Sequence, residues 1–347
     1  MIYKNIEFFN VEEIEIKDEY PGIRLHRFPK KVEVNMGWGR KSFGRWASGL
    51  TTGCEIRFVT EGDLVEISLS ALEAQGEVLV YKGDFFHSKH TLKVGVVNTL
   101  VLRENPEFKK LDSKVFQGCT FSPNVWRIIF CHNFTGVFYG INDFGYTVRP
   151  PKKLEIPNMK WMAYGSSITH GAGALTHTNS YIMQAARGLK VDVLDKGMGG
   201  SCLCENEVAD FLALDCNWDF ATLELGVNMR ESFTPDEFEE FAHYLITTIK
   251  QNNPFKHIFL VTIYPNSLHY INDDKDICVI TQREFDIRLR KIYSELEDDY
   301  LHLIEGSQIL KDFSYLTCDL IHPSEFGHIA MGESIAHKIK QVLFNRE

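Results

Sequence analysis

Residues 159–171 have the sequence MKWMAYGSSITHG, in which an apolar run ends abruptly in glycine and small polar residues. A short apolar run that stops at a turn is typical of a buried strand. Comparable runs follow along the chain, at Val191–Leu194, Phe220–Leu225, His257–Tyr264 and Leu301–Ile304. Helical patterns separate these runs. The C-terminal half is therefore predicted to be a doubly wound, flavodoxin-like α/β domain with a parallel sheet and helices on both faces.

The clearest helical pattern begins at Thr234, which is followed by Pro235 and Glu237. These residue types at these positions predict a capping box with proline in the first turn. Apolar residues from Phe238 onward then recur at helical spacing. Two further helices are expected, one containing Phe285–Leu296 and one after Pro323.

Residues 1–150 show a different pattern. Short runs rich in β-branched and aromatic residues, such as Leu64–Ser70 and Trp126–Phe130, alternate with turn signals. No window of this half carries a convincing helical period. This pattern predicts an all-β sandwich or jelly roll. The proline-rich stretch 149–158 is expected to connect it stiffly to the second domain, which gives predicted domains at 1–150 and 151–347.

Charge and hydropathy exclude several classes of partner. The formal net charge is −10 at pH 7, which disfavours nucleic acid and anionic membrane surfaces. The apolar runs are far shorter than the roughly 20 residues that cross a bilayer. The N-terminus lacks a basic region followed by an apolar stretch, so a cytoplasmic location is expected. No feature of the sequence predicts an oligomeric state.

Functional side chains of a parallel sheet lie beyond the carboxyl ends of its strands. Three loops at such ends, and one segment near the C-terminus, carry residues suited to acyl transfer. They are Gly165-Ser166-Ser167, Gly197-Met198-Gly199-Gly200, Gly226-Val227-Asn228 and Asp319-Leu320-Ile321-His322. Each of these residues alone is more often a cap or a loop residue, so only their joint occurrence indicates a catalytic site.

In order and spacing, these four segments resemble the signature blocks of the SGNH/GDSL hydrolase family, over about residues 159–345. The resemblance implies Ser167 as nucleophile, with Asp319 and His322 as orienter and base. It also implies an oxyanion hole formed by Ser167, Gly200 and Asn228. Ser166 and Met229 replace two aspartates of the commonest pattern, which leaves the subfamily and the substrate open.

The chemistry supports this mapping independently. A serine hydroxyl needs a base within hydrogen-bond reach, and the base needs a carboxylate that fixes its tautomer. Asp319 and His322 are three residues apart, so one loop can hold both. Attack on an ester leaves an oxyanion that backbone N–H groups and an amide side chain can stabilise. This mechanism requires neither a metal nor an organic cofactor.

The predicted function is that of a serine esterase that hydrolyses short-chain acyl esters, such as O-acetyl groups on a carbohydrate or another small molecule. The layout resembles the branch of the family that carries a β-sandwich ahead of the catalytic domain, which includes carbohydrate O-acyl esterases and acyltransferases. An acyltransferase with the same triad is one alternative. A non-catalytic carbohydrate-binding protein is the other, and retention of all five catalytic residue types argues against it.

Several residues outside the four motif segments also have predicted roles. His170, three residues past the nucleophile, is a candidate for binding substrate. Glu224 interrupts an apolar strand and is expected to be a paired structural group. Trp38, Trp46 and Trp126 are assigned to the packing of the sandwich rather than to sugar stacking. Because the loops after the first two strands are short, the N-terminal domain is expected to help shape the substrate entrance.

Overall fold

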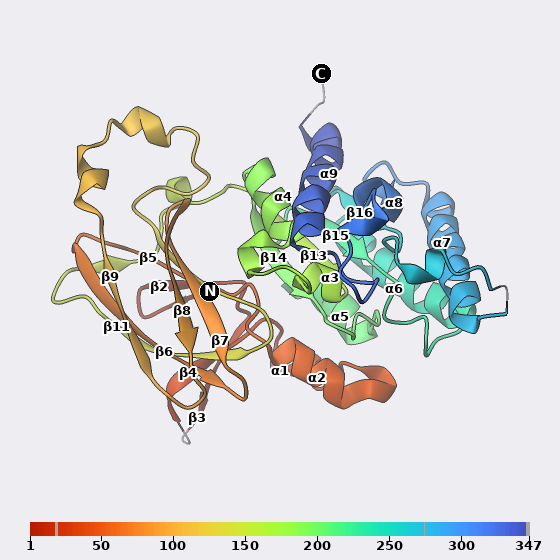
Figure 1. Ribbon diagram of the computed structural model, residues 1–347, viewed down its shortest axis with the longest axis horizontal. Helices are drawn as coiled ribbons and strands as arrows, with labels where there is room; N and C mark the ends of the chain where they lie inside the picture. The colour runs from red at the N-terminus through yellow and green to blue at the C-terminus, as the bar shows by residue number, and fades with distance from the viewer. Residues whose placement is uncertain (18–19, 274, 345–347) are drawn as a thin grey trace. The chain divides into compact units, whose positions relative to one another are not determined.

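The computed structural model describes residues 1–17, 20–273 and 275–344 (Figure 1). The last three residues of the predicted domain 151–347 lie outside this description. The chain forms two compact units. The sandwich unit consists of Met1–Lys30, Gly49–Asn158 and Lys190–Asp192, and the α/β unit of Lys31–Ser48, Met159–Leu189 and Val193–Glu347.

Two antiparallel sheets make up the sandwich unit, as the sequence predicted. The strand order in the first sheet is β1 (Ile2–Tyr3), β2 (Ile6–Phe9), β5 (Glu55–Thr60), β10 (Trp126–Phe130), β7 (Gly76–Lys82) and β8 (Phe85–Leu92), with β12 (Val148–Arg149) also paired to β5. In the second sheet it is β3 (Glu13–Lys17), β4 (Tyr20–His26), β11 (Thr135–Asn142), β6 (Leu64–Leu72) and β9 (Asn98–Arg103).

Alternating side chains of these strands form one apolar core. It includes Phe8, Phe58, Ile67, Trp126 and Phe138. Period-two alternation buries one side of each strand against the facing sheet, which is why β-branched and aromatic residues dominate these runs. Short 3₁₀ turns lie in the connections, at η2 (Pro106–Lys110), η3 (Ser113–Phe116) and η4 (Lys153–Glu155).

The α/β unit is built on a sheet with the order β14 (Asp192–Gly197), β13 (Lys160–Gly165), β15 (Phe220–Glu224), β16 (Ile258–Val261) and β17 (Leu301–Ile304). The β13–β15, β15–β16 and β16–β17 pairs are parallel. The order 2-1-3-4-5 is that of a flavodoxin-like fold. All five strands overlap the runs predicted from the sequence.

The longer helices of this unit pack in two groups. Helix α4 (Tyr181–Leu189) packs against α9 (Glu325–Leu343), and α6 (Pro235–Asn252) packs against α5 (Asn206–Asp210) and α7 (Ile277–Leu296). Shorter turns are α3 (Ser167–His170), α8 (Gly306–Ile309), η5 (His177–Asn179), η6 (Phe211–Asp215), η7 (Ser267–His269) and η8 (Phe313–Tyr315). Among the described residues, no helix has both the length and the apolarity needed to cross a membrane.

The expectation that residues 1–150 contain no helix is wrong for one segment. Helices α1 (Lys30–Glu33) and α2 (Lys41–Gly49), with η1 (Trp38–Arg40) between them, interrupt the strands. Both helices are shorter than the twelve-residue window in which a helical period is recognisable. Their segment, Lys31–Ser48, belongs to the α/β unit, so Trp38 and Trp46 are not part of the sandwich. Trp126 is fully buried in the sandwich, as expected.

Helix α6 begins as its sequence predicted. The Thr234 side chain accepts a hydrogen bond from the Glu237 N–H, and the Glu237 carboxylate accepts the Thr234 N–H at 2.7 Å. Phe238, Ala242, Leu245, Ile246 and Ile249 are its buried apolar residues. The capping box satisfies two N–H groups that the first turn leaves unpaired, so it fixes where the helix starts.

Thr234→Ala should therefore lower the free energy of unfolding by about 1 kcal/mol, the usual loss on removing such a cap. The measurement is urea denaturation followed by circular dichroism. Thr247→Ala in the middle of the same helix is the matched control. Because alanine is a better helix former than threonine, this control should be neutral or slightly stabilising. Equal destabilisation by both changes would contradict the role of the cap.

Candidate active site

The turn between β13 and α3 presents Ser167. Strand β13 ends at Gly165, and Ser167 is the first residue of the helix. Ser166 caps this helix, because its side chain accepts the Ile168 N–H at 3.2 Å. The Ser166 N–H donates in turn to the Glu224 carboxylate at 2.7 Å. These contacts fix the backbone on the N-terminal side of Ser167, whose own hydroxyl is left for another partner.

A second loop holds Asp319 and His322 together. One carboxylate oxygen of Asp319 accepts the N–H groups of Ile321 and His322, both at 2.9 Å. The other oxygen lies 2.7 Å from His322 Nδ1. Leu320, between them, has a left-handed φ of 60°, which turns the chain tightly enough for these bonds to form. Three-residue spacing thus places the carboxylate against the ring within a single loop.

The two loops meet at the end of the sheet. Ser167 Oγ lies 2.8 Å from His322 Nε2, so Ser167, His322 and Asp319 form a continuous hydrogen-bonded chain. When Nδ1 carries the hydrogen that Asp319 accepts, Nε2 presents its lone pair to the serine hydroxyl. The structure therefore brings together the three residues for which the sequence predicted nucleophile, base and orienter roles.

Asp319 is strongly held in its ionised form. Partial burial opposes ionisation. The hydrogen bonds from the His322 side chain and from the N–H groups of His322 and Ile321 outweigh that effect, and they hold the pKa of Asp319 well below its usual range. A permanent carboxylate beside Nδ1 can both select the tautomer of His322 and stabilise its protonated form.

The two remaining predicted residues lie in the neighbouring loops. Gly200, in the loop after β14, has a φ of 65°, a conformation that glycine adopts without strain. A Cβ atom at the adjacent Gly199 would lie 3.9 Å from Ser167 Cβ, which places this loop beside Ser167. The Asn228 carbonyl oxygen accepts the Cys202 N–H at 3.1 Å. That bond directs the NH₂ group of Asn228 away from Cys202. The sequence motif did not reveal this orienting role of Cys202.

His170 is buried rather than presented to solvent. Its Nδ1 contacts the Gly197 carbonyl oxygen at 3.1 Å, and a Cβ atom at Gly197 would lie only 2.3 Å from the His170 nitrogen. The end of β14 therefore packs tightly on α3. A role for His170 in binding substrate stays a prediction.

Glu224 supports the turn that carries Ser167. One carboxylate oxygen accepts both the Ser166 N–H and the Thr169 hydroxyl, at 2.7 and 3.1 Å. Glu224 is buried, and burial raises its pKa to about 7 despite these hydrogen bonds. These two partners of the carboxylate are neutral donors in the turn that carries Ser167. A Cβ atom at Gly165 would lie 2.6 Å from the same oxygen, so only glycine allows this approach.

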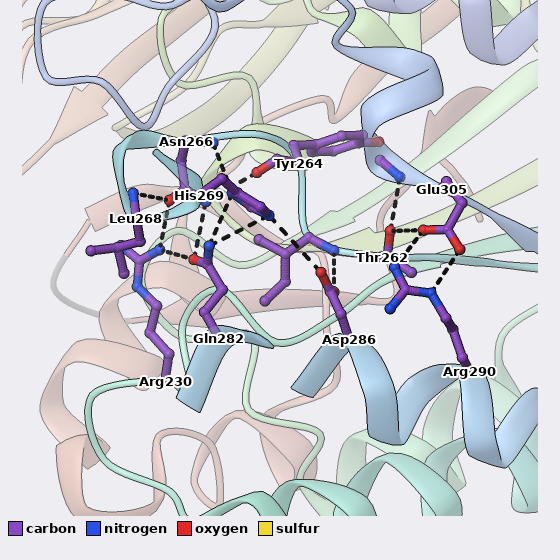
Figure 2. A network of polar contacts seen from close by, with 12 residues as sticks. Arg230, Thr262, Tyr264, Asn266, Leu268, His269, Gln282, Asp286, Arg290 and Glu305 are labelled. Carbon is purple, nitrogen blue, oxygen red and sulfur yellow. Dashed lines mark hydrogen bonds and ion pairs between the residues drawn. The ribbon is translucent and has the colours of Figure 1, made fainter. Parts of the chain in front are cut away.

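A polar network fixes the loop after β16 (Figure 2). Arg230, two residues beyond Asn228, donates to Gln282 at 2.7 Å, and Gln282 also accepts from the Asn266 side chain at 3.1 Å. The Ser267 N–H donates to the Leu320 carbonyl at 2.9 Å. The network therefore connects α7 to the loop that carries the histidine.

Comparisons with known proteins identify the family that the α/β unit matches and the fold of the chain. Residues 159–340 match the model of the GDSL-like lipase/acylhydrolase family. Among solved structures, a salicylyl-acyltransferase from a tetracycline biosynthetic pathway has a TM-score of 0.80 at 15% identity, over 98% of this chain and 96% of its own. A family two carbohydrate esterase from Clostridium thermocellum, in complex with cellohexaose, has a TM-score of 0.66 at 14% identity, over 97% and 99%. No curated protein sequence matches the chain significantly.

The raised pKa of Glu224 predicts a pH-dependent contribution to stability. A carboxyl whose pKa is higher in the folded state favours folding while it is protonated, and that contribution is lost as pH rises from about 4.5 through about 7. Glutamine cannot ionise. The free energy of unfolding of Glu224→Gln minus that of the native protein should therefore increase from pH 5 to pH 8, by on the order of 2 kcal/mol.

The measurement is urea denaturation of both proteins across this pH range. Glu205 is also buried with a pKa raised to about 7, but its contribution is common to both proteins and cancels in the difference. A difference that stays constant with pH would contradict titration of Glu224 in the native state.

Proposed function

Because the chain belongs to the GDSL-like lipase/acylhydrolase family, we propose that it is a serine esterase that hydrolyses short-chain acyl esters, such as O-acetyl groups on a carbohydrate or another small molecule. The observation that carries this proposal is the hydrogen-bonded chain from Ser167 Oγ through His322 to Asp319, with lengths of 2.8 and 2.7 Å. Such a chain is what activation of a serine hydroxyl requires.

In the proposed reaction, Ser167 attacks the ester carbonyl while His322 Nε2 takes its proton. The carbonyl oxygen becomes an oxyanion, which the N–H groups of Ser167 and Gly200 and the side-chain amide of Asn228 stabilise. Protonated His322 returns the proton to the leaving alcohol as the tetrahedral intermediate collapses to an acyl-enzyme. Water, deprotonated by the same histidine, then releases the acid and regenerates Ser167.

The same site is chemically able to transfer the acyl group to a second alcohol, and the high TM-score to an acyltransferase favours this as a second candidate. The two reactions differ only in what attacks the acyl-enzyme. The partition of product between acid and ester, measured with increasing added alcohol, distinguishes them. Carbohydrate substrates are supported by the fold shared with carbohydrate esterases.

The nucleophile is tested by two neighbouring serines. Ser167→Ala should abolish turnover of a 4-nitrophenyl ester and also stoichiometric labelling by a fluorophosphonate. Ser166→Ala removes a helix cap but no reacting atom, so most labelling should persist. Labelling that survives in Ser167→Ala and vanishes in Ser166→Ala would show that Ser166, not Ser167, is the nucleophile. A native protein that is never labelled would support the non-catalytic alternative.

Asp319→Asn tests the orienting carboxylate. Asparagine can still accept the backbone N–H groups of Ile321 and His322, but its NH₂ group would face Nδ1 and force the hydrogen of His322 onto Nε2. That ring cannot take the serine proton, a defect that costs about 10⁴-fold in kcat in a buried triad. We expect a smaller loss here, of about 10²- to 10³-fold, because the side chain of Asp319 is 48% exposed and water can relieve the mispairing.

The measurement is kcat on a small ester, with far-UV circular dichroism as a check on folding. Asp312→Asn is the matched control, because Asp312 caps η8 in the same way but contacts no catalytic residue in the described structure. An unchanged kcat in Asp319→Asn would reduce the site to a serine–histidine dyad.

A further inference from the structure

The segment Lys31–Ser48 is attached to the loop that carries Gly200. The Gly37 N–H donates to the Glu205 carboxylate at 2.7 Å, and the Trp38 indole N–H donates to the Leu203 carbonyl at 3.2 Å. The Trp38 ring also stacks on Phe241 of α6, with centroids 4.8 Å apart. Two hydrogen bonds and one stacked ring therefore fix this segment on the α/β unit. Both hydrogen-bond acceptors, Leu203 and Glu205, lie within five residues of Gly200 in the sequence.

The segment is also closed on itself. The Arg45 guanidinium donates twice to the Val34 carbonyl, at 2.6 and 3.0 Å. A Cβ atom at Gly44 would lie 2.6 Å from Gly37 Cα, so α2 packs directly on the turn that precedes it. Helix α2 is thus fixed on the turn at Gly37, which is itself bonded to Glu205.

Phe43 of α2 lies directly against Gly200. A Cβ atom at position 200 would lie 2.4 Å from Phe43 Cε1, closer than a real Cβ atom approaches another atom. The Trp46 ring is 5.4 Å from the Phe43 ring at an angle of 32°. Both side chains are 43% exposed although both are large and apolar. An aromatic pair thus borders the proposed oxyanion site and leaves part of its surface open.

We propose that Phe43 and Trp46 form a wall of the substrate site and determine specificity by stacking on a ring in the ester. This inference rests on the proposed function. If the proposed oxyanion site holds the carbonyl oxygen beside Gly200, a ring one or two bonds from that carbonyl is expected to lie near Phe43. Aromatic rings attract flat rings and the apolar faces of sugar rings at centroid distances of roughly 4.5–7 Å. The substrate class is therefore an ester with a ring on its acyl or its alcohol side.

Matched ester pairs test this, in two arms that separate the sides of the ester. The acyl arm compares methyl benzoate with methyl butyrate, and the alcohol arm compares benzyl acetate with butyl acetate. The proteins are the native chain, Phe43→Ala, Trp46→Ala and the ring-preserving Trp46→Phe. Phe255→Ala is the control, because Phe255 is 78% exposed in the same unit but precedes β16, at the opposite end of the strands from Ser167.

In at least one arm, Phe43→Ala and Trp46→Ala should lower kcat/KM for the ring ester more than for its acyclic partner, by about fivefold or more. Trp46→Phe should recover most of this selectivity, and Phe255→Ala should show none of the loss. The arm that responds identifies the side of the ester that the pair contacts. Equal losses on ring and acyclic esters, or no loss in either arm, would overturn the proposal.

A measurement without turnover separates this inference from the proposed function. Calorimetric titration of Ser167→Ala with methyl benzoate and benzyl acetate should give a Kd that rises at least about threefold, for one of the two, when Phe43→Ala is added. If the native protein hydrolysed no ester and resisted fluorophosphonate, the proposed function would fail while this titration still decided the role of the aromatic pair. An unchanged Kd for both ligands would overturn that role.

Discussion

The proposed catalysis depends on one constraint: His322 must present an unprotonated Nε2 to Ser167 from a loop that is far from it in the sequence. The Asp319 carboxylate meets this constraint with its two oxygens, one of which holds the loop backbone and the other the ring. Its pKa is held well below the usual range, so the carboxylate is ionised near neutral pH. The geometry of a single loop thus sets both the direction and the tautomer of the base.

Ser167, the proposed nucleophile, is positioned by a different kind of interaction. Glu224 binds the Ser166 N–H and the Thr169 hydroxyl with one oxygen, in a region where burial raises its pKa to about 7. Burying such a group opposes stability, because desolvation disfavours the carboxylate. The same buried carboxylate fixes the backbone of the turn that carries Ser167. This is a local conflict between stability and positioning of the kind expected at functional sites.

The sequence predicted those parts of the structure that local rules determine. Strand β13 and helix α6 follow from an apolar run and a capping box. The Ser167 and Asn228 segments follow from their places after strands, and the Asp319–His322 segment from its resemblance to a family motif. The segment Lys31–Ser48 could not be predicted in this way, because its helices are too short for a period to appear. Its attachment to Glu205 depends on contacts between residues about 170 positions apart. Likewise, the orientation of Asn228 depends on a backbone N–H, which no side-chain pattern encodes.

Access of water to the site bears on the choice between hydrolysis and transfer. The side chains of His322 and Asp319 are 28% and 48% exposed, so the base is not sealed from solvent in the free protein. Water, at about 55 M, competes strongly for an acyl-enzyme unless the site excludes it. Otherwise the acceptor alcohol must be bound so that its effective molarity at the acyl group exceeds the concentration of water. A transferase with this site would need its bound substrates to shield the acyl-enzyme from water. The exposed faces of Phe43 and Trp46 offer one surface on which a bound ring could do so, and without such a cover hydrolysis is the expected outcome.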